Sequence, residues 1–409
     1  MTIAPEVEPA QAGFDAARLK RLDAYFQRYV DDGRLAGWQI VLTRAGRVVH
    51  ATTYGVRDRA SGAPVEPDTL WRIYSMTKPI TSVAAMMLWE EGHFLLTDEI
   101  SRWLPEFADV RVFDKGTAVQ PYTVPAIEPI RIWHLLTHTA GLTYGFMRTS
   151  VVDSLYRAAG FDLHPPKGVD LTAACQAWAR LPLLFQPGTA WGYSIATDVL
   201  GRLVEVVSGQ SLPEFFAERI LGPLGMTQTR WWVDQPDAHR LATLYLPHPE
   251  TGLVVPAEEL GGYALAPPTL VSGGSGLIST AADYHRFTQM LLRQGELDGV
   301  RLLGRRTIAL MTRNHLPGGH DLARLNPGGL AETVLDGLGF GLGFAVVVDP
   351  LPSRLPSSAG EFNWGGMAST AFWVDPAEEL TALFFTQLMP SSTYPLRPHL
   401  RQLAYSALT

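Results

Sequence analysis

Cysteine is nearly absent from this chain of 409 residues, because Cys175 is its only one. A single cysteine can form neither an intrachain disulfide nor a thiolate metal site, so packing must hold the fold together. Positive charge is also scarce, since 33 Lys and Arg residues stand against 40 Asp and Glu residues and give a formal net charge of −7. Nucleic-acid binding requires clustered basic residues, so we expect no nucleic-acid partner.

Long apolar runs are missing as well. Although 46% of the residues are hydrophobic, no stretch reaches the roughly 18 to 20 uninterrupted apolar residues that a membrane-spanning helix needs. The sequence therefore predicts a globular protein with a large core and no membrane partner. The first 13 residues carry Pro5, Glu6, Glu8 and Pro9 where a secretory signal would have positive and then apolar residues, which predicts a cytoplasmic protein.

The pattern of apolar residues places strands at both ends of the chain. Helical spacing predicts a helix over 14–30, and β-rich runs predict a hairpin from 37–43 and 47–53. Near the other end the pattern predicts three strands and a helical tail, at 344–348, 369–374, 380–386 and 397–408.

Between these ends the chain has a mainly helical pattern. We therefore predict an α+β protein, a mainly antiparallel sheet flanked by helices and interrupted by a helical insertion. The sheet domain would comprise 1–96 plus 272–409, the helical domain 97–271, and the active site would lie between them.

The first candidate for chemistry is Ser75-Met76-Thr77-Lys78, at the predicted start of an apolar helix that ends near Gly92. Residues three apart share a helix face, so the Lys78 ammonium can reach the Ser75 hydroxyl. A serine becomes a nucleophile only beside a base, and a lysine acts as a base only where its pKa falls from about 10.4. With four lysines in the chain, such a pair arises by chance in roughly one chain in four.

The second candidate is Tyr193, in a turn that precedes a helix predicted over 197–207. A tyrosine hydroxyl held there suits proton transfer if a nearby cation lowers its pKa from about 10. The alternative is that Tyr193 is an ordinary packing residue.

The third candidate is the segment Asn363–Ser369, which we predict to open a strand. Its glycine pair, Gly365-Gly366, permits the close backbone approach that substrate binding and an oxyanion hole of backbone N–H groups both require. The alternative is a simple β-bulge.

Taken together and in this order, the three segments resemble the serine β-lactamase and penicillin-binding superfamily, and within it the class C-like esterases called family VIII carboxylesterases. Ser75 and Lys78 match the S-x-x-K element, and Tyr193 matches the tyrosine of the Y-x-N or Y-S-x element. Trp364-Gly365-Gly366 stands in the place of K-T-G. The resemblance extends over nearly the whole chain.

The resemblance implies a β-lactamase/DD-peptidase-like fold and a set of roles. Ser75 would be the acylated nucleophile, Lys78 and Tyr193 its base, and the backbone N–H groups of Ser75 and Met367 the oxyanion hole. No cofactor or metal is implied.

Two departures from the family pattern bear on the substrate. Neutral Trp364 replaces the K-T-G lysine, and Ile195 replaces the asparagine of Y-x-N. Both changes favour neutral, apolar acyl groups over β-lactams, and we expect substrate contacts from Trp364, Gly365, Gly366, Tyr144 and Trp191.

We therefore predict a serine carboxylesterase for short to medium acyl esters, with a small-molecule ester as its partner and little β-lactamase activity. One alternative is an acyltransferase of the same superfamily, and another is a non-catalytic ligand-binding module with this fold.

Three further signals point away from other chemistries. His134 and His138, four apart on a predicted short helix, could ligate zinc, but they lack an H-E-x-x-H frame and we expect them to be structural. The glycine-rich segment 272–276 has no phosphate-loop spacing and predicts a tight turn near the site. The absence of any G-x-S-x-G motif argues against an α/β-hydrolase.

Overall fold

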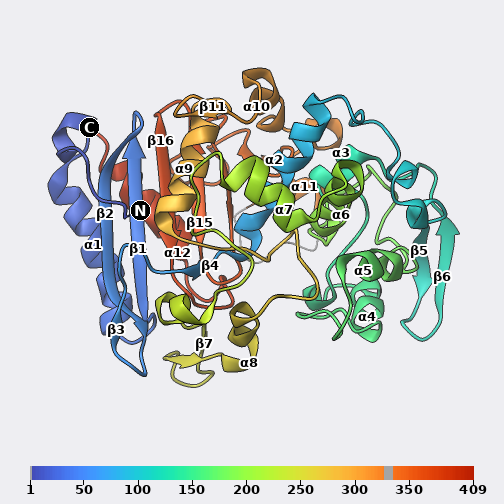
Figure 1. Ribbon diagram of the computed structural model, residues 1–409, viewed down its shortest axis with the longest axis horizontal. Helices are drawn as coiled ribbons and strands as arrows, with labels where there is room; N and C mark the ends of the chain where they lie inside the picture. The colour runs from blue at the N-terminus through green and yellow to red at the C-terminus, as the bar shows by residue number, and fades with distance from the viewer. Residues whose placement is uncertain (1, 327–334) are drawn as a thin grey trace.

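A computed structural model describes residues 2–326 and 335–409. Its centre is an antiparallel sheet of eight strands in the order β12-β13-β14-β15-β16-β1-β2-β3. Figure 1 shows this sheet with α1 along its outer side, and the middle of the chain forming helices and the β5–β6 hairpin at the far side. The strands of the sheet are β1 (Gly37–Arg44), β2 (Arg47–Asp58), β3 (Ala63–Pro64), β12 (Leu338–Phe340), β13 (Ala345–Val347), β14 (Phe362–Gly365), β15 (Ala371–Asp375) and β16 (Leu380–Phe385).

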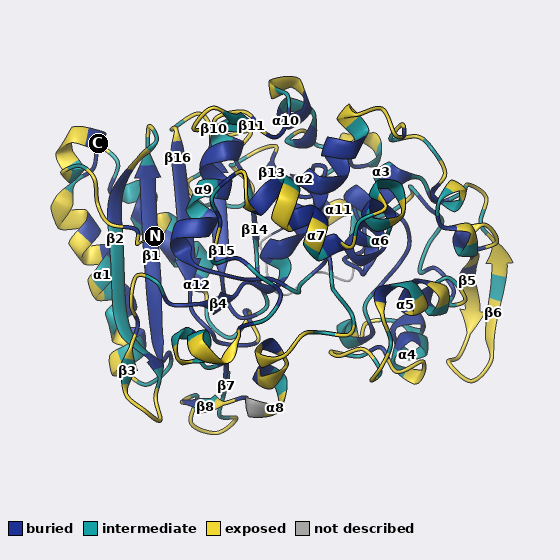
Figure 2. Ribbon diagram, viewed as in Figure 1, coloured by how far each residue is buried: buried dark blue, intermediate teal, exposed yellow. Residues whose placement is uncertain are grey.

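Alternating side chains give this sheet two apolar faces. In β1, Ile40 belongs to the core cluster on one face and Val41 to the cluster on the other. Helices α1 (Ala16–Asp31) and α12 (Leu396–Ser406) cover the first face, and α2 (Thr77–Glu90) and α9 (Ala281–Leu292) cover the second. A sheet buried on both faces explains why its central strands are buried along nearly their whole length, as Figure 2 shows.

The remaining elements mostly connect and cover this core. The helices are α3 (Ile132–Leu136), α4 (Val151–Ala158), α5 (Leu171–Trp178), α6 (Ala196–Ser208), α7 (Leu212–Phe216), α8 (Glu258–Gly261), α10 (Arg305–Met311) and α11 (Leu322–Leu325). The paired short strands are β4 (Trp71–Arg72) with β9 (Ile278–Ser279), β5 (Arg111–Gly116) with β6 (Pro121–Pro125), β7 (Tyr245–Pro247) with β8 (Val254–Pro256), and β10 (Glu296–Leu297) with β11 (Val300–Arg301).

The predicted fold class is confirmed, with one correction. The segment Asn363–Ser369 ends strand β14 and does not open the next one. Its glycines begin a tight turn in which the Gly366 N–H donates to the Thr370 carbonyl at 2.9 Å, and Ser369 has φ 68°. Strand β15 therefore starts at Ala371.

The ranges of the predicted domain division contain different elements. The strands of the main sheet come from 37–64 and 338–385, and 97–271 contributes helices α3 to α8 together with the hairpins β5–β6 and β7–β8. The division into two domains stays a prediction. No helix within the described residues combines the length and apolarity needed to cross a membrane.

Candidate active site

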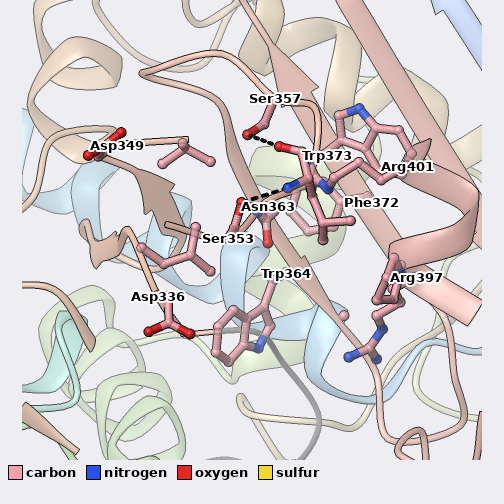
Figure 3. A pocket seen from close by; sticks show the side chains of 16 residues that line it. Asp336, Asp349, Ser353, Ser357, Asn363, Trp364, Phe372, Trp373, Arg397 and Arg401 are labelled. Carbon is pink, nitrogen blue, oxygen red and sulfur yellow. Dashed lines mark hydrogen bonds between the residues drawn. The ribbon is translucent and has the colours of Figure 1, made fainter. Parts of the chain in front are cut away.

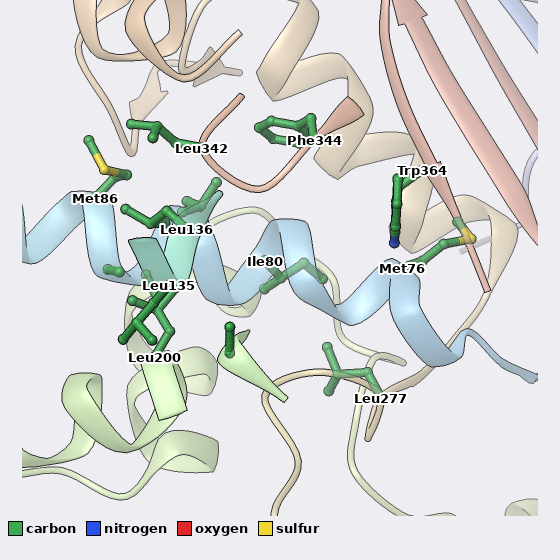
Figure 4. Close-up of a cluster of buried hydrophobic side chains, with 14 of the residues drawn as sticks. Met76, Ile80, Met86, Leu135, Leu136, Leu200, Leu277, Leu342, Phe344 and Trp364 are labelled. Carbon is green, nitrogen blue, oxygen red and sulfur yellow. The ribbon is translucent and has the colours of Figure 1, made fainter. Parts of the chain in front are cut away.

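Ser75 lies in a short 3₁₀ turn, Tyr74–Met76, that leads into α2. The helix begins two residues later than predicted, because Tyr74 has φ 45° and the Met76 N–H donates to the Ile73 carbonyl in a tighter turn. Every residue of α2 from Thr77 to Leu88 is buried. Figure 4 shows the apolar side chains around it, and this packing makes the helix a rigid support for Ser75, which is itself half-buried.

Two polar side chains converge on the Ser75 hydroxyl oxygen. The Tyr193 hydroxyl donates to it at 2.7 Å, and the Lys78 Nζ donates to it at 3.3 Å. Lys78 is only 2% exposed, and among the described residues no carboxylate lies within 4.0 Å of its Nζ. Its Nζ also donates to the Gly274 carbonyl at 2.8 Å, which holds the ammonium beside Ser75.

Tyr193 sits in an aromatic cage just before α6. Its ring centroid lies 5.0 Å from that of His138, 5.4 Å from those of Tyr144 and Trp364, and 6.1 Å from that of Trp191. The Trp364 Nε1–H donates to the Tyr193 oxygen at 3.4 Å. Burial, and secondarily the charge of Lys78, hold the pKa of His138 well below its usual value, so this imidazole is neutral.

The turn after β14 lies close to the segment that carries Ser75. A Cβ on Gly366 would stand 2.5 Å from the Ile73 carbonyl oxygen, so only glycine permits this approach. Within the described part of the chain, neither the backbone N–H of Ser75 nor that of Met367 donates to a protein acceptor. The two groups that we expect to form the oxyanion hole are therefore available for a substrate.

A cavity of about 390 Å³ adjoins Ser75. Tyr144, a predicted contact residue, lines it together with Ser75 and with Met367, which we expect in the oxyanion hole. Most other side chains in its wall are aromatic or aliphatic, among them Tyr156, Phe161, Trp178, Trp231, Leu260, Leu270 and Met389.

Comparison with known proteins decides the family. The family model described as Beta-lactamase matches residues 22–406. The chain belongs to the beta-lactamase family. Esterase EstB of Burkholderia gladioli is 33% identical over 424 residues, which cover 98% of this chain and 99% of that protein.

Two further comparisons support this membership. Protein Rv1367c of Mycobacterium tuberculosis is 37% identical over 370 residues, which cover 90% of this chain and 89% of that protein. The solved structure of EstCE1, described as a hydrolase with promiscuous acyltransferase activity, has a TM-score of 0.79 at 29% identity and covers 95% of this chain and 98% of its own.

Four residues expected to contact substrate do not line the cavity beside Ser75. Trp191 and Trp364 are both buried behind Tyr193, where their rings pack against it and against Phe340. A Cβ on Gly365 would point at the Arg397 guanidinium, and one on Gly366 at Thr370 and Ile73, so both glycines face neighbouring protein atoms. Trp364, which we expect to stand in the place of the K-T-G lysine, thus contacts Tyr193 in this member of the beta-lactamase family.

Trp364 also lines a second, smaller cavity of about 100 Å³ between β14 and α12, shown in Figure 3. Its wall includes Asn363, Arg397 and Arg401 but not Ser75. The Arg397 Nη2 donates to the carbonyls of Gly366 at 2.7 Å and Thr370 at 3.0 Å, which ties the turn after β14 to α12.

The two histidines considered as zinc ligands do not form a helical pair. Helix α3 ends at Leu136, and His138 lies beyond it with φ 56°. The His134 Nδ1 accepts from the Arg131 N–H at 3.0 Å, whereas the His138 Nδ1 is 3.1 Å from the Ser194 hydroxyl oxygen. Across the described ranges, no group of three or more His, Cys, Asp or Glu residues could hold a metal ion.

Asp198, a carboxylate near Lys78 in the first turn of α6, is not among the residues that the sequence motifs predict. It is 4% exposed, and its Oδ1 accepts from the Ser272 hydroxyl at 2.5 Å and the Gly274 N–H at 3.1 Å. Burial raises the pKa of Asp198, while the charge of Lys78 opposes that rise. The predicted tight turn at 272–276 thus connects Asp198 to Lys78. The sequence signal that could have identified Asp198 is a charged residue on the apolar face of a predicted helix.

Proposed function

We propose that this protein is a serine ester hydrolase that forms an acyl-enzyme on Ser75. The observation that carries the proposal is the convergence of the Tyr193 hydroxyl and the Lys78 Nζ on Ser75 Oγ beside an apolar cavity. A serine hydroxyl gains nucleophilic strength when a positioned group can take its proton. Membership of the esterase subgroup called family VIII stays a prediction.

The reaction has two steps with the same residues in each. In the reactive form the Tyr193 and Lys78 pair carries one proton fewer than a hydroxyl and an ammonium together. Ser75 Oγ then bonds to the ester carbonyl carbon while its proton passes to that pair. The N–H groups of Ser75 and Met367 hold the resulting oxyanion. The bond to the alcohol oxygen breaks and the alcohol leaves with that proton, after which water attacks the acyl-enzyme in the same way.

The cavity supports neutral, apolar acyl groups as the substrate class. Its wall is mainly aromatic and aliphatic, and the neutral indole of Trp364 occupies the place of the lysine in K-T-G. A β-lactam carboxylate would therefore lack the positive charge that this lysine supplies.

The test compares kcat/KM for p-nitrophenyl acetate, butyrate and octanoate with that for nitrocefin, using the native protein and Ser75→Ala. We expect ester turnover by the native protein, loss of turnover in Ser75→Ala with an unchanged unfolding midpoint, and slow or absent nitrocefin turnover. Nitrocefin turnover comparable to ester turnover would contradict the substrate assignment.

Acyl transfer is a second candidate, because the structurally similar EstCE1 is described as having promiscuous acyltransferase activity. In this reaction an alcohol replaces water in the second step. The two reactions are distinguished by incubating the protein with p-nitrophenyl butyrate and 1-butanol and measuring how much butyl butyrate and how much butyric acid form. A butyl ester as the main product in dilute 1-butanol would favour acyl transfer.

A further inference from the structure

One wall of the cavity beside Ser75 differs in chemistry from the rest. Asp198 lines it and is 4% exposed. The other charged residues of the wall, Asp162, His164, Lys167 and Glu259, are all more exposed than Asp198. A carboxylate enclosed in this way is costly unless donors surround it.

The donors that reach Asp198 account for one of its two oxygens. The Ser272 hydroxyl and the Gly274 N–H both donate to Oδ1. Within the described residues, no other residue donates to Oδ2. The second oxygen is therefore the one able to accept from a ligand.

Tyr144 brings a hydroxyl close to that free oxygen. A Cβ on Gly274 would stand 2.7 Å from the Asp198 Oδ2 and 3.2 Å from the Tyr144 hydroxyl oxygen, so the two oxygens lie on the same side of Gly274 and near one another. No hydrogen bond in the described structure joins them, and both residues line the cavity. Two oxygens placed in this way are close enough for one small polar group to bridge.

The charges nearby select the kind of group. Burial, together with Asp198 and Tyr193, raises the pKa of Tyr144 well above its usual value, so its hydroxyl keeps its proton and can donate. The Lys78 Nζ lies 5.4 Å from the centroid of the Tyr144 ring, so an ammonium group there would meet a like charge. A neutral hydroxyl can donate to Asp198 and accept from Tyr144, and so satisfies both.

We propose that Asp198 Oδ2 and the Tyr144 hydroxyl form a subsite that binds a hydroxyl group carried by the ester substrate. The inference rests on the proposed ester hydrolase function and names a feature of its substrate. The hydroxyl belongs either to the acyl group or to the alcohol group of the ester, and the chemistry of recognition is the same for both.

The experiment uses two pairs of esters in which a hydroxyl replaces a methyl group of similar size. The acyl pair is p-nitrophenyl 3-hydroxybutanoate and p-nitrophenyl 3-methylbutanoate, and the alcohol pair is 2-hydroxyethyl butanoate and propyl butanoate. For each pair, the ratio of kcat/KM values is measured in the native protein, Tyr144→Phe and Asp198→Asn. Because each ratio compares two substrates on one protein, general losses of activity cancel.

We expect the hydroxyl-to-methyl ratio of one pair to fall about tenfold in Tyr144→Phe, as for the loss of one hydrogen bond. Asp198→Asn should lower the same ratio, while its amide oxygen still accepts from Ser272 and Gly274. The pair that responds identifies which part of the substrate carries the hydroxyl.

Tyr156→Phe is the matched control, because it removes a tyrosine hydroxyl from the same cavity wall but away from Gly274. Ratios unchanged in both Tyr144→Phe and Asp198→Asn would overturn the subsite, as would an equal fall in Tyr156→Phe. In either case, turnover of the methyl esters by the native protein would leave the ester hydrolase function standing. Absence of turnover for all four esters would overturn both proposals.

Discussion

Two side chains contact the Ser75 oxygen, and in the proposed mechanism they take its proton as one unit. The Tyr193 hydroxyl lies 2.7 Å from it and the Lys78 Nζ 3.3 Å, while the ammonium stands 4.6 Å over the Tyr193 ring. We predict that Tyr193→Phe and Lys78→Ala each lower kcat by orders of magnitude, and that the double variant is little worse than the poorer single one. Losses that multiply in the double variant would show independent roles.

Trp364 contacts Tyr193 on the side away from the cavity that adjoins Ser75. Its Nε1–H donates to the Tyr193 oxygen at 3.4 Å, and its ring does not line the cavity that adjoins Ser75. Trp364→Phe removes the donor and keeps an aromatic ring, so we predict a several-fold lower kcat for p-nitrophenyl butyrate with little change in KM. Steady-state kinetics check this, and a raised KM at unchanged kcat would show that the indole touches substrate instead.

At the scale of elements, the turn between β14 and β15 must fit against the segment before Ser75. An alanine at 366 would put its Cβ 2.3 Å from the Thr370 Oγ1 and 2.5 Å from the Ile73 carbonyl oxygen. We predict that Gly366→Ala lowers stability by about 1 to 3 kcal/mol, as overpacking does, and lowers kcat because Met367 shifts.

Gly262→Ala is the control for that substitution, since a Cβ there meets no atom within 4 Å. Urea unfolding and ester kinetics on both variants give the comparison. Equal stability and equal kcat for the two would mean that the turn tolerates displacement.

The sequence predicts helices and strands well where the apolar pattern is long, and poorly where contacts with distant segments determine the structure. The apolar spacing of 14–30 locates α1 to within two residues. Its start is fixed by Asp15, which caps the helix by accepting from the Ala17 and Arg18 N–H groups. Strand β12 has three residues between glycine-containing segments, which is too short for an alternating pattern. No local pattern could assign it.

The same distinction holds in the site. The S-x-x-K pair and Tyr193 come together as predicted from the motifs, because a helix turn fixes the first contact and the fold supplies the second. Trp364 was expected to face substrate, and its position behind Tyr193 depends on how β14 packs against the segment before α6. The hydrogen bonds of Asp198 likewise depend on a distant segment, because residues 272–276 pack against the start of α6.

For the whole molecule, a buried ionic cluster joins the sheet to α12. Glu361 is fully buried and accepts from the Arg401 guanidinium. The Tyr405 hydroxyl oxygen lies 2.8 Å from Glu361 Oε2 and 2.6 Å from Asp375 Oδ2, so its one proton lies between two carboxylates. Burial raises the pKa of Glu361, while Arg401 opposes that rise. Removing Arg401 therefore leaves an enclosed carboxylate without its cation.

We predict that Arg401→Met lowers the free energy of unfolding by about 3 to 5 kcal/mol near pH 8, and that Arg401→Met with Glu361→Gln loses less. A carboxyl with a raised folded-state pKa stabilises the fold at low pH and loses that contribution as the pH rises through the folded pKa. The deficit of Arg401→Met should therefore shrink toward pH 4.5. Urea midpoints at both pH values check this, and a deficit that grows on acidification would contradict it.

The most direct test of the account is to trap the acyl-enzyme that it requires. A fluorophosphonate that reacts with activated serines is added to the native protein, and the modified residue is located by peptide mass spectrometry. The account predicts one adduct per chain on Ser75, much slower labelling in Tyr193→Phe and Lys78→Ala, and none in Ser75→Ala. An adduct on Ser194, Ser272 or Ser275 in place of Ser75, or no adduct at all, would contradict it.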